Sequence, residues 1–290
     1  MSEHDNEIAI KLENVSFTYS IDSEPTLKNI NLEVKKGELI GLVGPTGSGK
    51  TTLLNVIAGV LPHYYPGDLQ GQVSIFGKST MEMSMAQNSI LVGLVMQDPD
   101  SQLFNLFVRD EIIWGLENLG VPREQIAEIR TSASKQFRIH HLLDRITYDL
   151  SGGEKQLTAI TATFIMNPKI LLFDNPTSAL DPLGSQMVYE AIQDLRRNNP
   201  EVTIIVNDDK VQELSAYTER MWLIDGGEVK IDAKPEEFFT HRKELANAMI
   251  RMPVVTEVAY ELSQRGLWKG KLPLTVEQFA IFYGEQSIAV

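Results

Sequence analysis

The chain has 290 residues, a formal net charge of −13 and no cysteine. The lack of cysteine excludes disulfide frameworks, cysteine-ligated metal sites and thiol nucleophiles, and it suits a reducing compartment. The acidic charge disfavours nucleic acid as the main partner, because phosphate contacts need Lys and Arg.

A secretory leader and a membrane span are not expected. The first residues, MSEHDNEIAIKLENV, lack the basic and apolar regions of a signal peptide. The longest apolar stretch, residues 90–96, is far shorter than the ~20 residues that a spanning helix needs. We therefore expect the chain to stay in the cytosol unless a partner brings it to a membrane.

Short strands of two kinds are predicted. Apolar and polar residues alternate, as in half-buried antiparallel strands, at residues 8–19, 30–35 and 72–76. Continuous apolar runs, which are typical of strands buried in a parallel sheet, lie at residues 39–43, 170–173 and 203–206. A loop and then a helical pattern follow each buried run, so the sequence predicts an α/β fold.

Helical patterns and one hairpin connect these strands. Helical patterning dominates from about residue 98 to 165, which suggests an inserted helical lobe. Asp181 and Pro182 predict the start of another helix, with Asp181 as its N-cap. One face of that helix is expected to carry Leu183, Met187, Val188, Ala191, Ile192 and Leu195.

The last part of the chain begins with a predicted hairpin at residues 221–232, which turns at Gly226 and Gly227. Beyond it, helical patterning predicts a small extension. Gly266 is expected to end one helix, and Thr275 with Gln278 can form a capping box for the next.

Residues 44–51, GPTGSGKT, match the phosphate-binding loop (P-loop) G-x-x-x-x-G-K-[ST]. Such a loop turns backbone N–H groups toward phosphates, at the positive N-terminus of the next helix. Lys50 is expected to reach the β- and γ-phosphates, and the Thr51 hydroxyl to bind Mg²⁺. A dinucleotide fingerprint is excluded because Thr52 replaces its third glycine. The predicted nucleotide contacts are Gly44, Pro45, Thr46, Gly47, Ser48, Gly49, Lys50, Thr51 and Thr52.

A second anion-binding surface is predicted at residues 150–156, LSGGEKQ, where Ser151 can cap a helix with free N–H groups. With this motif the chain resembles the ATP-binding cassette (ABC) family, whose signature is LSGGQ. Glu154 is a common variant of its last position. The resemblance implies that this surface closes on ATP held by a second ATPase subunit, in a head-to-tail dimer, through Ser151, Gly152, Gly153 and Glu154.

Other family motifs follow in the same order along the chain. Asp174 matches the Walker B aspartate near Mg²⁺, and Gln97 matches the Q-loop glutamine, which touches the metal and the attacking water. Asp181 belongs to the D-loop, which crosses the dimer interface in the family. Tyr19 matches the aromatic residue that stacks on adenine, whereas taken alone it is better explained as a core aromatic of a strand.

Two positions depart from the family. Asn175 stands where the family has the Glu that polarises the attacking water, and an amide cannot accept a proton at neutral pH. Asp208 is aligned with the histidine that donates to the γ-phosphate. A carboxylate ~4 Å from a phosphate charge is repelled by about 4 kcal/mol at an effective dielectric of 20. We therefore expect ATP binding with poor hydrolysis; the alternative is an active site in which other residues supply the chemistry.

One branch of the family matches best. Residues 96–122, MQDPDSQLFNLFVRDEIIWGLENLGVP, resemble the energy-coupling-factor (ECF) ATPases, and residues 251–254 and 272–275 resemble their C-terminal extension. The resemblance implies ATP and Mg²⁺ as cofactors and a location at the cytoplasmic face of the cell membrane. The implied partners are a second, non-identical ATPase subunit, a transmembrane coupling protein and a membrane substrate-binding protein. The implied cargo is a vitamin or a transition-metal ion.

The implied fold is an α/β P-loop NTPase core, mostly a parallel sheet flanked by helices, with an antiparallel β subdomain. The ABC ATPase domain is expected at residues 1–235, and a dimer-contacting extension at residues 236–290. Two other functions remain open: the ATPase of a conventional importer with an external binding protein, and a non-catalytic ATP-binding regulator. Co-purification with integral membrane proteins would separate the regulator from a transporter subunit.

Overall fold

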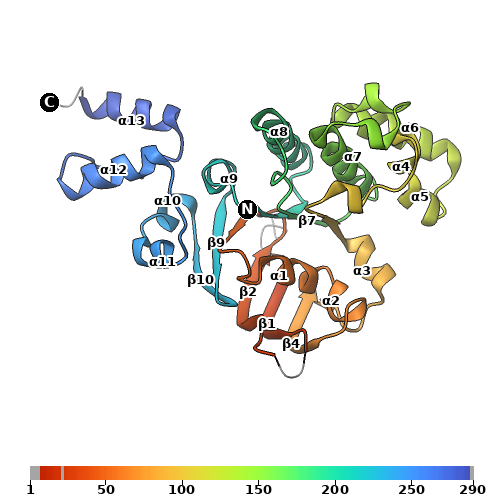
Figure 1. Cartoon of the computed structure of the whole chain (residues 1–290), viewed down its shortest axis with the longest axis horizontal. Helices are drawn as coiled ribbons and strands as arrows, with labels where there is room; N and C mark the ends of the chain where they lie inside the picture. The colour runs from red at the N-terminus through yellow and green to blue at the C-terminus, as the bar shows by residue number, and fades with distance from the viewer. Residues whose placement is uncertain (1–6, 21–22, 288–290) are drawn as a thin grey trace.

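The computed structural model describes residues 7–20 and 23–287, and two sheets form its frame (Figure 1). The 4-stranded antiparallel sheet has the order β2-β1-β4-β5 and consists of Ile8–Thr18 (β1), Leu27–Lys35 (β2), Asp68–Ile75 (β4) and Lys78–Ser79 (β5). The 6-stranded sheet has the order β10-β9-β3-β8-β7-β6 and consists of Leu39–Val43 (β3), Val92–Val95 (β6), Ile170–Asp174 (β7), Thr203–Asn207 (β8), Arg220–Asp225 (β9) and Glu228–Ala233 (β10).

The observed strands confirm the two predicted kinds. Every residue of β3, β7 and β8 is buried, and these strands pair in parallel. The antiparallel strand β2 alternates buried and exposed residues along most of its length. The predicted hairpin is present as β9 and β10, which pair antiparallel. Strand β6 was not predicted, although it lies within the apolar stretch of residues 90–96, and it pairs in parallel with β7.

Helices cover both faces of the larger sheet (Figure 1). The segments α4 to α7 fall within the residues predicted to form a helical lobe. The helices are Lys50–Ile57 (α1), Val60–His63 (α2), Met85–Leu91 (α3), Val108–Glu111 (α4), Trp114–Asn118 (α5), Arg123–Gln136 (α6), Gly152–Phe164 (α7), Pro182–Asn198 (α8), Val211–Tyr217 (α9), Pro235–Phe238 (α10), Arg242–Asn247 (α11), Val254–Gln264 (α12) and Val276–Ser287 (α13).

Two large apolar cores lie on the two faces of the 6-stranded sheet. Alternation along the strands divides their side chains between the cores, so that Ile170 and Leu172 of β7 join one core and Leu171 and Phe173 join the other. The first core lies between this sheet, α1 and the antiparallel sheet, and the second includes α7 and α8. The carboxyl ends of β3, β7 and β8 are thereby held side by side.

Helix α8 begins as predicted but buries a narrower face. The Asp181 carboxylate accepts a hydrogen bond from the Gly184 N–H at 2.7 Å, which caps the helix. Val188 is buried, whereas Leu183 is 67% exposed and Met187 is 37% exposed, so the predicted apolar face is wrong at its first turns. The cause is the close approach of α7 and α8 at their starts, which turns these two side chains into a cleft instead of the core.

The C-terminal helices pack on the same core as the sheet. Phe238, Phe239 and Trp268 belong to the apolar cluster that includes residues of β9 and α8. Gly266 has a φ of 72°, which suits its predicted place directly after α12. The Thr275 hydroxyl accepts a hydrogen bond from the N–H of Gln278 at 3.2 Å, which is one half of the predicted capping box. The Gln278 side chain accepts instead from the N–H of Leu274 at 2.7 Å. No helix within the described residues has both the length and the apolar character needed to cross a bilayer.

Candidate nucleotide-binding site

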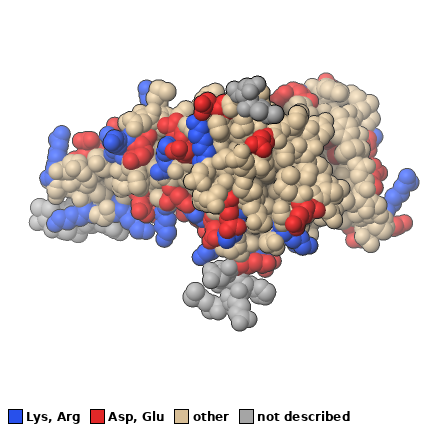
Figure 2. Space-filling view, turned by 90° about the horizontal axis from the view of Figure 1, so that it is seen from below, with Lys and Arg blue, Asp and Glu red and all other residues tan. Residues whose placement is uncertain are grey.

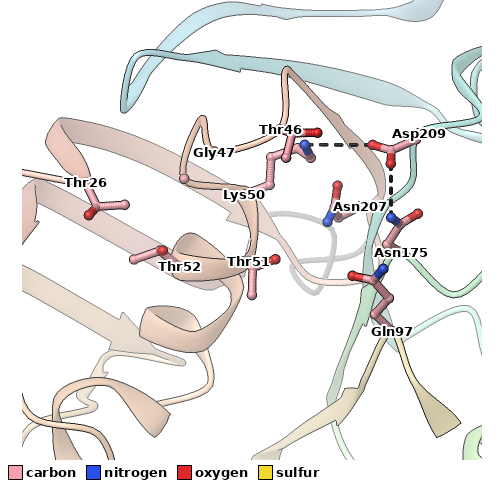
Figure 3. A pocket seen from close by; sticks show the side chains of 11 residues that line it. Thr26, Thr46, Gly47, Lys50, Thr51, Thr52, Gln97, Asn175, Asn207 and Asp209 are labelled. Atoms are coloured by element: carbon pink, nitrogen blue, oxygen red, sulfur yellow. Dashed lines mark hydrogen bonds and ion pairs between the residues drawn. The ribbon is translucent and has the colours of Figure 1, made fainter. Parts of the chain in front are cut away.

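The P-loop leaves β3 and enters α1, as the sequence predicts (Figure 3). Gly49 has a φ of 105°, and a Cβ there would lie 2.9 Å from the Thr26 carbonyl oxygen, so this turn requires glycine. The loop borders a cavity of about 280 Å³. The Ser48 hydroxyl of this loop is buried without a hydrogen-bond partner among the described residues.

Lys50 lies folded back under this loop. Its Nζ donates to the carbonyl oxygens of Gly44 at 2.8 Å and Pro45 at 3.0 Å, and lies 3.8 Å from an Asp209 carboxylate oxygen. Burial lowers the pKa of Lys50, while the negative charges of Asp209 and Asp174 act in the opposite direction. Phosphate oxygens in the cavity would replace these acceptors and favour the charged ammonium.

Asp174 is held at the carboxyl end of β7 by two donors. Its Oδ1 accepts hydrogen bonds from the Thr51 hydroxyl at 3.0 Å and from the Asn207 amide at 2.6 Å. Hydroxyl and carboxylate oxygens suit Mg²⁺, which typically keeps several waters and shares substrate phosphates. The described residues contain no cluster of three or more His, Cys, Asp or Glu that could hold a metal alone. Thr51 and Asp174 therefore fit a Mg²⁺ ion that arrives together with a nucleotide. Such an ion would neutralise part of the phosphate charge.

Asn175 turns its amide toward the phosphate end of the cavity (Figure 3). Its Nδ2 donates to an Asp209 carboxylate oxygen at 3.1 Å, and its buried Oδ1 has no hydrogen-bond partner among the described residues. That oxygen can accept a hydrogen bond from a water molecule but cannot take its proton. The backbone φ of 50° lies in the left-handed region, where Asn is favoured over Glu.

Asp208 does not lie where the sequence analysis expected it. The side chain is 1% exposed and does not line the cavity. Its carboxylate accepts hydrogen bonds from the Thr177 hydroxyl at 2.7 Å and from the Lys210 N–H at 2.9 Å. Burial raises the pKa of Asp208, and these two donors oppose that change. Asp208 is therefore a structural carboxylate, and its expected position beside the γ-phosphate is wrong.

Asp209 occupies the position that had been expected for Asp208. It lines the cavity and contacts both Lys50 and Asn175 (Figure 3). The physical reason is the alternation of side chains at the end of β8. Asn207 faces Asp174, so the next residue points to the opposite side and Asp209 returns to the cavity. Extending this period-two pattern past the predicted strand would have placed Asn207 and Asp209 on one face and Asp208 on the other. The sequence analysis named neither Asn207 nor Asp209 as a site residue.

Two other predicted residues lie at this cavity. Gln97 follows β6 and lines the cavity beside Asn175. Tyr19 is 48% exposed and lies over the first turn of α1, with its hydroxyl 3.0 Å from the Thr52 hydroxyl. It also contacts Phe17 edge-on, with ring centroids 4.9 Å apart. The position of Tyr19 is compatible with an adenine platform, and adenine stacking itself stays a prediction.

The signature residues form a separate site. Ser151 and Glu154 form a full capping box at the start of α7, as predicted for Ser151. Burial alone would raise the pKa of Glu154, but hydrogen bonds from Ser151 and the charge of Arg145 lower it. A cleft of about 330 Å³ lies between this helix start and the D-loop, bordered by Gly152, Gly153 and Asp181 among others. None of these residues lines the P-loop cavity, so the signature cleft and the P-loop cavity are two separate sites on the chain.

A strand-to-helix P-loop after β3, an acidic residue at the end of β7 in the same sheet and a separate capped signature helix define an ABC-type nucleotide-binding domain. The family model of ABC transporters matches residues 27–178. A Pyrococcus abyssi protein named "Putative ABC transporter ATP-binding protein" is 41% identical over 258 residues, which cover 89% of this chain and 92% of that protein. The chain belongs to the ABC transporter family and is an ATP-binding subunit of that kind.

Two solved structures share this fold. CbiO1 of Clostridium perfringens, described as part of the ABC transporter complex CbiONQ, is similar with a TM-score of 0.75 and 28% identity, over 90% of this chain and 96% of that one. A dimeric ATP-binding cassette in a post-hydrolysis state with ADP and Pi is similar with a TM-score of 0.68 and 26% identity, over 78% of this chain and 98% of that one. ABC ATPases of this family bind ATP with Mg²⁺ and work as dimers with membrane subunits.

Proposed function

We propose that this chain is the ATPase subunit of an ECF-type importer and that its own site hydrolyses ATP slowly. It binds MgATP at the P-loop cavity and pairs with a second, non-identical ATPase subunit. Its signature surface completes the site of that partner. The dimer drives a transmembrane coupling protein and a membrane substrate-binding protein at the cytoplasmic face of the membrane, for uptake of a vitamin or a metal ion.

The proposal that this site hydrolyses ATP slowly rests on the pair formed by Asn175 and Asp209. Their side chains meet at 3.1 Å at the end of the cavity next to Lys50. An amide in place of the family's Glu leaves no base at that position, and loss of a positioned base typically costs 10²–10⁴ in rate. The Ser151 capping box is complete, so the surface offered to a partner is unaffected.

An apolar groove supports docking to membrane subunits. The groove has a volume of about 540 Å³ and lies between α3, α5 and α7, with Phe104 and Trp114 on its rim. These rings are 52% and 46% exposed and pack edge-on with centroids 4.6 Å apart. The buried Glu111 fixes the loop beneath them by accepting the N–H groups of Phe104 and Asn105.

The surface around this groove is also poor in charge. Between Thr51 and Gln97 only Asp68, Lys78 and Glu82 are charged. Figure 2 accordingly shows a broad uncharged area on the half of the molecule that carries α2 and α3. A rigid, exposed and uncharged groove suits a short apolar helix of a membrane protein. The similarity to CbiO1, described as part of a transporter complex, supports the ECF branch.

Two measurements on the same preparation test this function. Purification from a native membrane extract is expected to recover integral membrane proteins and a second ATPase. The chain alone is expected to bind ATP with little phosphate release, and Lys50→Ala controls for contaminating ATPases. ATP turnover by the chain alone that disappears in Lys50→Ala would refute the impaired site. Recovery without membrane proteins would favour an ATP-binding regulator.

A further inference from the structure

Asp209 lies at the end of the cavity that a third phosphate would enter. The cavity runs from Thr26 and Thr52 past Lys50 to Asn175 and Asp209 (Figure 3). A P-loop lysine reaches the β- and γ-phosphates of a bound nucleotide. The γ-phosphate of ATP therefore extends past Lys50 toward Asp209, whereas the β-phosphate of ADP ends at the loop.

The charges at this end are unfavourable for a further anion. Lys50 is the one cation among the described residues that line the cavity. Asp209 lines it as well, and Asp174 behind it adds a second negative charge that acts on Lys50. One Asp209 oxygen lies 3.8 Å from the Lys50 ammonium, and the other accepts the Asn175 amide. Asp209 thus offsets the positive charge of Lys50, which would otherwise attract a γ-phosphate. It also accepts the hydrogen bond of the Asn175 amide, which could otherwise donate to a γ-phosphate.

We propose that Asp209 weakens the binding of nucleoside triphosphates to this site relative to that of nucleoside diphosphates. The inference rests on the proposed nucleotide site and specifies its ligand preference. ATP must share Lys50 with the Asp209 carboxylate and place its γ-phosphate beside a second negative charge. ADP does not reach that charge. The Asp209 side chain is 60% exposed and can rotate toward solvent, so it weakens ATP binding without blocking it.

The test compares dissociation constants for ADP and ATP by isothermal titration calorimetry on the purified full chain, with EDTA present so that hydrolysis does not interfere. Asp209→Asn removes the charge and keeps the size of the side chain. It is expected to tighten ATP binding about tenfold, which corresponds to about 1.4 kcal/mol, and to change ADP binding less than twofold. Asp209→Glu keeps the charge and is expected to keep the wild-type ratio.

Asp110→Asn is a matched control. Asp110 is 50% exposed, lies 3.7 Å from an Arg109 nitrogen and does not line the cavity. This variant is expected to bind both nucleotides like the wild type. The proposal would be overturned if Asp209→Asn left the ratio of the ATP and ADP dissociation constants unchanged, whether both constants fell equally or neither changed. Rapid MgATP turnover by the wild-type chain would refute the impaired site instead, because the titrations contain no Mg²⁺.

Discussion

Replacing Asn175 by glutamate and Asp209 by histidine, the two residue types that act on the attacking water and the γ-phosphate in the ABC family, should restore hydrolysis. The double variant Asn175→Glu, Asp209→His supplies a carboxylate for the attacking water and an imidazole for the γ-phosphate. A positioned base contributes 10²–10⁴ in rate. We expect roughly a 100-fold gain, at the lower end of that range. The φ of 50° at residue 175 lies in the left-handed region, where a Glu backbone is less stable by about 1–2 kcal/mol.

The two substitutions should be strongly non-additive. Asn175→Glu alone replaces the 3.1 Å hydrogen bond to Asp209 by two carboxylates in contact. Two such charges 4 Å apart repel by ~1 kcal/mol in water and by about 4 kcal/mol at an effective dielectric of 20. Because the Asp209 side chain is 60% exposed, the lower value is the better guide. We expect a gain of a few-fold at most from either single variant, and a gain in the double variant that exceeds their product.

The assay is phosphate release by the assembled transporter, with the partner's own ATP site inactivated so that turnover reports on this chain. Lys50→Ala in this chain gives the background. Asn175→Gln with Asp209→His is the control, because the longer amide still cannot accept a proton. A double variant no faster than the wild type would show that these two residues do not limit hydrolysis. Equal gains with Glu and Gln at position 175 would show that no base is involved.

Three further predictions follow from individual contacts. Ser151→Ala removes the cap of α7 at a cost of about 1 kcal/mol and should lower the turnover of the partner's site on the order of 100-fold; an accompanying loss of this chain's own ATP affinity would contradict the separation of the two sites. Gly49→Ala, with its Cβ 2.9 Å from a carbonyl oxygen, should lower the free energy of unfolding by more than about 1 kcal/mol in denaturant titrations, and by more than Gly77→Ala, whose Cβ meets nothing within 4 Å. Burial raises the pKa of the Asp208 carboxyl above its ordinary value of 3.8, so the native state binds a proton there more tightly than the unfolded chain does. The native state therefore loses stability as pH rises from 3.8 through the raised pKa. Asp208→Asn should therefore gain in melting temperature relative to the wild type as pH rises above 3.8, and a difference that does not change with pH would refute the raised pKa.

Local sequence patterns were sufficient to predict much of the fold and the P-loop side of the nucleotide site. The P-loop, the buried strands β3, β7 and β8, and the caps at Asp181 and Ser151 were all predicted. Each of these features depends on residues a few positions apart, through the period of a strand, the donors of a helix start or the φ that glycine permits. The family resemblance rests on the same short motifs, and the comparisons confirm it at the level of an ABC transporter ATP-binding subunit.

The sequence-based predictions failed where the burial of a side chain or the existence of a strand depended on contacts with distant parts of the chain. Leu183 and Met187 follow helical spacing, yet the approach of α7 to α8 removes them from the core. Strand β6 lies in a short apolar run, which periodicity alone does not assign to a strand or a buried helix, and it is defined by pairing with β7, far away in sequence.

The same reason applies to the phosphate end of the cavity. By itself the sequence located the P-loop motif, predicted a nucleotide at residues 44–52 and placed two carboxylates after β8. Only the tertiary structure decided that Asp209 and not Asp208 faces Lys50, because the direction of each side chain depends on the register of β8 against β7. That register also brings Asn175 and Asp209, 34 positions apart, within hydrogen-bonding distance.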